Sequence, residues 1–156
     1  MKKSKNGITL SVFIVYCFLL TVVLFLRNGR DFSLEITKLG QRISENANLV
    51  PFKTINNYMN ALDNRIVSSS VVINNLIGNF VLFLPMGFFL PEITGKCCFI
   101  RSEALILIMI LLAEIIQLIT GLGSFDVDDI ILNFTGSIIG YSAFLICKKS
   151  IRKADK

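Results

Sequence analysis

Carboxylate and amide side chains stand at helical spacings inside or beside long apolar stretches of this 156-residue chain. Side chains three or four residues apart share one face of a helix. An ionisable group inside a membrane is costly unless it is paired, hydrated or protonated, so Glu114 is a candidate functional residue. Amides alone more often join helices by hydrogen bonds. The spaced pairs are Asn75 and Asn79, Glu114 and Gln117, and Asp129 and Asn133.

Three carboxylates lie close together in the segment before the last apolar stretch: Asp126, Asp128 and Asp129. An Asp at a helix N-terminus caps free N–H groups, and one is enough. We expect Asp126 or Asp128 to cap the helix, which leaves Asp129 to face inward with Asn133. The cluster could engage a cation, or the amine and hydroxyl groups of a polar head group. The spacing of a calcium-binding EF-hand loop is absent.

The composition excludes several kinds of catalytic and metal site. The chain has no His, which removes a histidine general base, a catalytic triad and a His-ligated metal. The four cysteines, Cys17, Cys97, Cys98 and Cys147, are interpreted as reduced packing residues. We therefore expect no metal, no cofactor and no recognisable catalytic constellation.

The apolar stretches indicate an all-α integral membrane protein with about four transmembrane helices. Hydrophobic residues make up 53% and charged residues 17% of the chain, against about 45–50% and about 25% in soluble domains. At about 1.5 Å per residue, an uncharged run such as 8–26 is close to the thickness of a bilayer. The predicted spans are 8–26, 71–90, 99–119 and 130–147, within a single membrane domain 1–156. Pro85 predicts a kink in the second span, and Gly136 and Gly140 predict a close helix approach in the fourth.

The basic residues predict that both termini lie in the cytoplasm. The N-terminal tail, the hairpin between spans two and three, and the C-terminal tail carry Lys and Arg, whereas the connection between spans three and four has only acids. The net charge of +5 is therefore assigned to membrane orientation rather than to nucleic-acid binding. The long segment 27–70 carries six basic residues against this rule, so the topology depends on the tails and the acidic loop.

The segment between spans one and two predicts two short amphipathic helices on the outer side. Phe32, Ile36, Leu39 and Ile43 repeat at helical spacing, and so do Ile55, Met59, Leu62 and Ile66. Pro51 separates the two patterns. With this topology, the costly polar groups of the spans are all expected to collect in the outer leaflet.

Four motifs in order resemble those of the VanZ-like membrane proteins. They are NLVPFKTI at 48–55, NLIGNFVLFLPMG at 75–87, EIIQ at 114–117, and FDVDDIILN at 125–133 with Gly136, and together they cover about 46–141. Many relatives carry an Arg beside the Phe-Asp pair, where this chain has Gly123 and Ser124. The resemblance implies a multi-pass protein of a Gram-positive plasma membrane, in a family named for a member that confers low-level resistance to teicoplanin, an acylated glycopeptide.

Several functions fit these residues. The leading one is a non-enzymatic envelope protein that lowers susceptibility to teicoplanin or lipoglycopeptides through an outer-leaflet polar site. Its partners would be membrane lipids and a lipid-linked wall precursor or an acylated glycopeptide. The alternatives are an intramembrane lipid-headgroup enzyme with a carboxylate base, a cation or proton pathway through Glu114, and a structural partner of a larger envelope complex.

Overall fold

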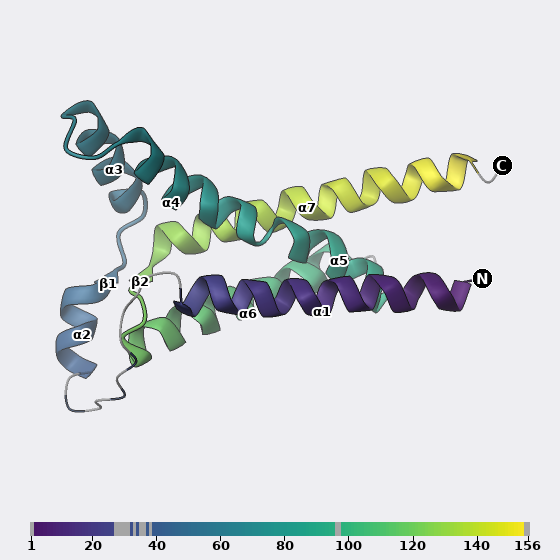
Figure 1. Ribbon diagram of the computed structural model, residues 1–156, viewed down its shortest axis with the longest axis horizontal. Helices are drawn as coiled ribbons and strands as arrows, with labels where there is room; N and C mark the ends of the chain where they lie inside the picture. Colours follow the sequence, from purple (N-terminus) through teal and green to yellow (C-terminus); the bar gives the residue numbers. More distant parts are fainter. Residues whose placement is uncertain are drawn as a thin grey trace.

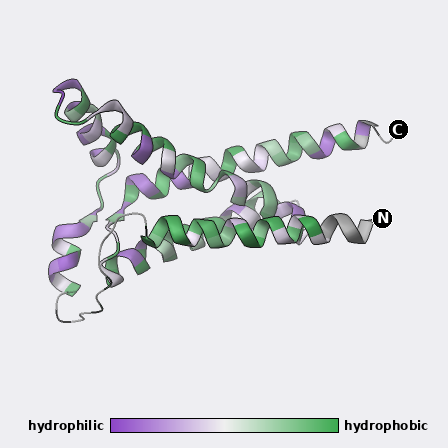
Figure 2. Ribbon diagram, in the orientation of Figure 1, coloured by the Kyte–Doolittle hydropathy of each residue, from purple (hydrophilic) through white to green (hydrophobic). Residues whose placement is uncertain are grey.

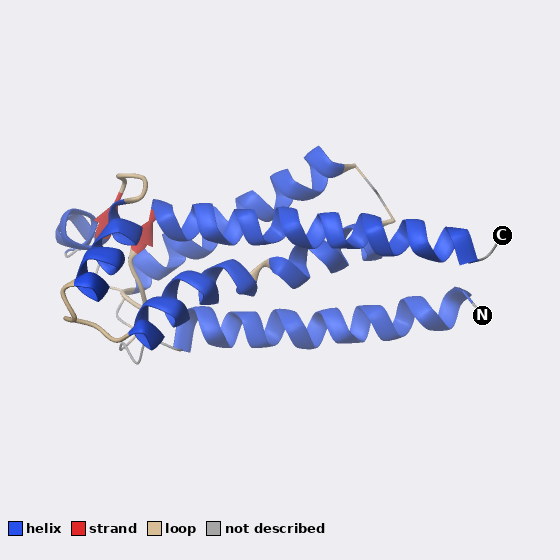
Figure 3. Cartoon of the chain, turned by 90° about the horizontal axis from the view of Figure 1, so that it is seen from above, coloured by secondary structure: helices blue, strands red, loops and turns tan. Residues whose placement is uncertain are grey.

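Four long apolar helices run side by side along the long axis of the protein, which is described by a computed structural model (Figures 1 and 3). The structure describes residues 2–26, 32, 34, 37, 39–95 and 98–154. Within them the helices are α1 (Lys2–Leu26), α2 (Leu39–Asn46), α3 (Lys53–Asp63), α4 (Ser69–Leu82), α5 (Leu84–Thr94), α6 (Phe99–Thr120) and α7 (Val127–Ala154), and the strands are β1 (Ala47–Asn48) and β2 (Phe125–Asp126). The predicted positions Ile36, Lys96 and Cys97 lie outside the described residues.

The four candidate membrane spans are Gly7–Leu26, Ser69–Thr94, Phe99–Thr120 and Val127–Ile151. The prediction of an all-α membrane protein with four transmembrane helices is confirmed. Their lipid-facing sides are apolar, as Figure 2 shows for α1, and the exposed residues include Phe18, Ile77, Ile108 and Ile146. The helices of the second and fourth spans extend a few residues beyond the predicted spans: α5 continues through Pro91 to Thr94, and α7 covers Val127–Ala154.

The second span is broken rather than merely kinked. Phe83 separates α4 from α5, and Pro85 stands in the first turn of α5, where the missing N–H costs nothing. The Tyr16 hydroxyl of α1 donates a hydrogen bond of 2.7 Å to the Leu82 carbonyl at the break. A neighbouring helix therefore satisfies a backbone group at the break, as the membrane interior requires.

Helix α7 packs closely on α4 and α5 because glycines replace side chains at the contact. A Cβ atom at Gly136 would collide with the Phe80 carbonyl oxygen, and one at Gly140 would collide with that of Leu84. Gly87 of α5 makes the reciprocal approach to Ser137. The close approach predicted from the Gly136 and Gly140 spacing is confirmed. It fixes α7 in the middle of the bundle, from which its polar residues reach the other helices.

A polar layer closes the end of the bundle opposite the two termini (Figure 1). It consists of α2, α3 and the two-stranded parallel sheet, in which Ala47 pairs with Phe125 and Asn48 with Asp126. Hydrophilic residues are frequent on α2 and α3 (Figure 2). Pro51 and the left-handed Phe52 (φ 64°) separate the two short helices, as the sequence predicted. Below this layer, the apolar core is made of Leu20, Phe83, Met86, Ile106 and Ile110.

Candidate functional site

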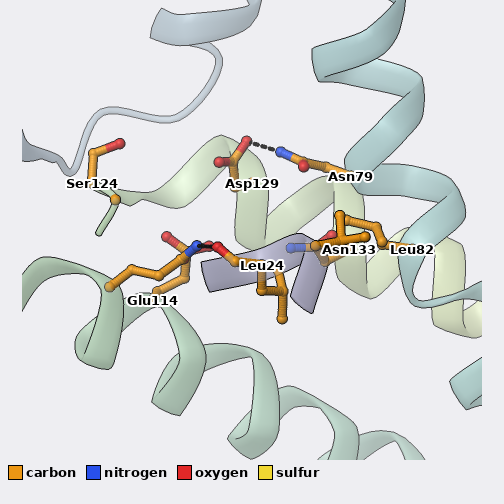
Figure 4. Close-up of a pocket in the computed structure, with 10 residues that line it drawn as sticks. Leu24, Asn79, Leu82, Glu114, Ser124, Asp129 and Asn133 are labelled. Carbon is orange, nitrogen blue, oxygen red and sulfur yellow. Dashed lines mark hydrogen bonds between the residues drawn. The ribbon is translucent and has the colours of Figure 1, made fainter. Parts of the chain in front are cut away.

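A small polar cavity lies beneath the polar layer, between α1, α4, α6 and α7 (Figure 4). Its volume is about 50 Å³, which is room for a few water molecules or one small polar group. Five of the eight predicted site residues line it. The lining consists of Val23, Leu24, Asn79, Leu82, Glu114, Gln117, Gly123, Ser124, Asp129 and Asn133.

Asp129 and Asn79 join α7 to α4 across the cavity. The Asn79 side-chain N–H donates a hydrogen bond to Asp129 Oδ1 (Figure 4). Asn79 is buried, whereas Asp129 is half-buried. Asp129 therefore faces inward with Asn133, as predicted from the spacing of four residues.

Glu114 brings a second carboxylate to the cavity from α6. Its side chain is 3% exposed, and Oε2 accepts a 3.1 Å hydrogen bond from the backbone N–H of Asp126. This donor lies in β2, the strand that precedes α7, so Glu114 also holds the start of that helix in place.

Gln117 and Asn133 complete the polar lining. The Gln117 Nε2 group donates to the Leu24 carbonyl at the end of α1, at 2.8 Å. Asn133 is 2% exposed and its Oδ1 atom has no hydrogen-bond partner. Its side chain points into the cavity (Figure 4). An unsatisfied acceptor in a dry site costs about 1–3 kcal/mol, so a hydrogen-bond donor arriving here would be stabilised.

Asp126 serves the architecture rather than the cavity. Its Oδ1 accepts from the Asp128 N–H at 2.9 Å, which caps α7. Oδ1 also accepts from Asn48 Nδ2 at 3.1 Å, and Oδ2 from the Thr54 hydroxyl at 2.6 Å. The capping role that the sequence offered to Asp126 or Asp128 belongs to Asp126.

Asp128 is fully buried and caps a different helix. Its two carboxylate oxygens accept hydrogen bonds from the backbone N–H groups of Phe52, at 2.5 Å, and Ile55, at 3.0 Å. These are the N-cap and third positions of α3. A carboxylate from α7 thus replaces the local side-chain cap that α3 lacks.

Asn75 does not reach the cavity. It lies one turn before Asn79 on α4, and its Nδ2 group bonds the Val71 carbonyl of its own helix at 2.8 Å. The carboxylates of Asp126 and Asp128 are likewise bound to protein groups. The predicted ligand-binding set therefore separates into a cavity group and a structural group.

Asn48 and Thr54, which hold Asp126, were missed as site residues although they lie in the first motif. The sequence shows only that these two residues are polar and lie near Pro51. Nothing in its periodicity links them to Asp126, which is more than 70 residues away.

The expectation that every costly polar group of the spans lies at the outer end is wrong for Glu103. This residue is 3% exposed in α6, and its Oε2 atom lies 2.6 Å from the Ser137 hydroxyl, while Oε1 has no partner. It precedes Glu114 by eleven residues on the same helix face, about 16 Å along the axis. The spacing of eleven residues from Glu114 therefore indicates, from the sequence alone, that Glu103 shares its helix face.

The cavity favours binding of a group that donates hydrogen bonds. Two carboxylates and an unpartnered amide oxygen line it, and none of the described lining residues is basic. Within the described residues, no group of three or more His, Cys, Asp or Glu side chains could hold a metal ion. Cys17, Cys98 and Cys147 are free thiols.

The chain is a multi-pass α-helical membrane protein with a buried polar site. It has four apolar spans, a polar layer at one end and a small acidic cavity beneath that layer. The VanZ/LLP1 family profile matches residues 13–148, and the chain belongs to this family. The resemblance predicted from the four motifs is therefore confirmed.

A curated relative extends this comparison. Protein VanZ of Enterococcus faecium is 27% identical over 111 residues, which cover 70% of this chain and 60% of that protein. The matched part is thus less than two thirds of the relative's length. No solved structure matches the chain.

Proposed function

We propose that this chain is a VanZ-like protein of a Gram-positive plasma membrane that lowers susceptibility to teicoplanin or lipoglycopeptides. It does so by binding a polar group of an amphiphile at the outer leaflet, and not by catalysis. The binding residues are Glu114, Gln117, Asp129, Asn133 and Asn79. Membrane lipids, and a lipid-linked wall precursor or the acylated drug itself, are the proposed partners.

The observation that carries this proposal is the cavity itself. Acidic and amide side chains from three spans converge on about 50 Å³ of buried space, at the end of the bundle away from the basic tails. The positive-inside rule assigns that end to the outer face. Membership of the VanZ/LLP1 family supports the link to glycopeptides, because a relative that matches 70% of this chain is a VanZ protein.

The test compares susceptible Gram-positive cells that carry the chain, its Asp129→Asn variant, or no chain. Cell-bound fluorescent teicoplanin is measured beside vancomycin, which lacks the acyl tail. We expect the chain to reduce teicoplanin binding and leave vancomycin binding unchanged. Asp129→Asn returns teicoplanin binding to the level of cells without the chain, because the substitution removes charge from the cavity but keeps its shape.

Asp63→Asn is the matched control, because Asp63 is an exposed carboxylate on α3 that lies outside the cavity. Membrane abundance of each variant is measured by immunoblot. Equal teicoplanin binding in all strains, at equal abundance, would refute the proposal. So would an Asp129→Asn variant that is as protective as the parent chain.

A further inference from the structure

An apolar groove adjoins the polar cavity and opens on the lipid-facing side of the bundle. It lies between α1 and the α4–α5 span and has a volume of about 300 Å³. Helix α1 packs on α5 but makes little contact with α4. Because α4 diverges from α1 toward α3 (Figure 1), the groove stays open between them. Its lining consists of Tyr16, Leu19, Leu20, Val23, Gly78, Val81, Leu82 and Pro85.

The groove meets the cavity at two apolar side chains. Val23 of α1 and Leu82 of α4 line both spaces, so a molecule that occupies both passes these two residues. The polar layer covers the outer end of the bundle (Figure 1), whereas the groove faces the bilayer. A ligand that arrives from the bilayer along this route combines an apolar chain with a small polar end. Its source is therefore a membrane lipid.

Asn133 is the cavity residue that a small polar end would bind. Its side chain is 2% exposed and points into the cavity (Figure 4). Its Oδ1 atom is buried and has no hydrogen-bond partner. A buried acceptor without a donor is destabilising, so a ligand that brings a donor to this atom is stabilised there. The polar end of the ligand must therefore donate a hydrogen bond.

The depth of the cavity indicates that this polar end is uncharged. Asn133 follows the first residue of α7 by six residues, and Glu114 precedes the last residue of α6 by six, so each lies about 9 Å from its helix end. An ionised group is costly at this depth in a bilayer, and the apolar boundary of Val23 and Leu82 offers it no partner. This argument does not depend on the charge balance of the carboxylates in the cavity.

The size of the cavity narrows the choice further. About 50 Å³ admits a few water-sized groups, which excludes a sugar or a peptide stem. A hydroxyl group is about as large as one water molecule, donates one hydrogen bond and accepts others. It is therefore the simplest group that satisfies the depth, the size and the unpartnered Asn133 acceptor together.

We infer that the cavity and the groove together bind an uncharged membrane lipid that ends in a hydroxyl group, as a diacylglycerol does. The hydroxyl donates a hydrogen bond to Asn133 Oδ1, and one acyl chain lies in the groove between α1 and α4. This inference rests on the outer-leaflet binding function proposed above, and it names the class of lipid that the site takes.

The test measures competition between lipids for the purified full chain in detergent. The labelled probe is a diacylglycerol with a fluorophore at the end of one acyl chain, read by anisotropy. Four unlabelled competitors share its acyl chains and carry, at the same position, the free hydroxyl, its methyl ether, a phosphate or a primary amine. We expect the free hydroxyl to compete about tenfold more strongly than the other three, a ratio that corresponds to about 1.4 kcal/mol. Any of the three that equals or exceeds it would overturn the inference.

Asn133→Leu separates a ligand-binding role from a structural one. Leucine is similar in size and removes the unpartnered acceptor, so we expect an unchanged melting temperature without added lipid and loss of the preference for the hydroxyl over its methyl ether. Asn75→Leu is the matched control and keeps the preference, because Asn75 bonds the Val71 carbonyl of its own helix and does not line the cavity. A preference that persists in Asn133→Leu would contradict the assigned site.

A second pair of variants tests the groove without touching the cavity. Val81→Trp, at a groove position 49% exposed to lipid, weakens binding of the hydroxyl lipid and of its methyl ether without changing their ratio. Ile108→Trp, on the exposed face of α6 and outside the groove, is the matched control and leaves binding unchanged. Equal binding by these two variants would show that the acyl chain does not use the groove.

Free glycerol separates a lipid ligand from a soluble alcohol. We expect it to displace the labelled diacylglycerol only at concentrations far above the affinity of the lipid, because glycerol cannot use the groove. Displacement at equal concentration would refute the lipid assignment. The two proposals fail separately: protected cells without a hydroxyl preference reject only this inference, and a hydroxyl preference without protection rejects only the resistance function.

Discussion

Three neighbouring carboxylates perform three different tasks at the start of α7. Asp126 caps α7 and binds Asn48 and Thr54, while Asp128 caps α3. Only Asp129 lines the cavity. Asp128 and Asp129 point in different directions because successive residues of a helix turn by about 100°, and Asp126 lies before the helix, in β2. Equal chemistry at adjacent positions therefore does not mean equal function.

Asp128→Ala tests the structural task. The substitution leaves the N–H groups of Phe52 and Ile55 without acceptors, and loss of a helix N-cap costs about 0.5–2 kcal/mol. We expect faster amide hydrogen exchange across 52–55 and a lower melting temperature in detergent. Asp128→Asn, which keeps one oxygen, has an intermediate effect, and Asp63→Ala on the exposed side has almost none. Unchanged exchange at 52–55 would contradict the capping role.

The pairing of Glu114 with Gln117, and of Asp129 with Asn133, could be predicted from spacing because helical periodicity is a local property. The contacts of Asp128 with Phe52 and Ile55 could not, because they join segments more than 70 residues apart. Asn75 was predicted as a site residue because it is an amide four residues before Asn79. Its side chain instead donates a hydrogen bond to its own helix, which the sequence alone does not indicate.

At the scale of elements, the helices associate through close backbone contact, because the hydrophobic effect does not drive helices together inside a bilayer. Lipid tails are as apolar as leucine side chains, so association in the membrane depends on packing and on polar contacts. Gly136 and Gly140 bring α7 against α4 and α5, and that approach puts Asp129 within reach of Asn79. The four spans followed from composition and length. The break at Phe83 did not, because Pro85 alone indicates a kink but not where hydrogen bonding is interrupted.

Gly136→Ala tests this packing. Even one methyl group would meet the Phe80 carbonyl oxygen, so α4 and α7 must separate. Overpacking of this kind costs about 1–3 kcal/mol. We expect a lower melting temperature in detergent and loss of the Asp129-dependent reduction in teicoplanin binding. Gly40→Ala in α2, where nothing lies within 4 Å of the added Cβ, is the control and leaves both unchanged. Equal melting of the two variants would show that the close approach is not needed.

At the scale of the whole molecule, the site and the two termini lie at opposite ends of the bundle (Figure 1). An even number of spans returns the chain to the side on which it began, which agrees with basic residues near both termini. The six basic residues of 27–70 are the exception, and three of them, Arg42, Lys53 and Arg65, lie in the described polar layer or just after α3. Arg42 donates to the Ile119 carbonyl at the end of α6, at 2.6 Å, which gives this cation a structural partner.

Single cysteines in a cysteine-free background test the orientation. Asp63→Cys on α3 and Lys149→Cys near the end of α7 replace exposed residues at opposite ends of the molecule. A membrane-impermeant maleimide is expected to label position 63 in intact cells and position 149 only after permeabilisation. The reverse pattern would place the cavity on the cytoplasmic side.

The parallel pairing of β1 with β2 has a consequence for biosynthesis. Asn48 leaves the ribosome long before its partner Asp126, and domains acquire their contacts as the chain emerges. The α2–α3 segment therefore stays without its strand partner and without the cap from Asp128 until α6 and α7 have been inserted. We expect proteases to cut this segment in a nascent chain arrested before residue 126, and not in the finished chain. The last span to be synthesised thus completes the segment that lies between the first two spans.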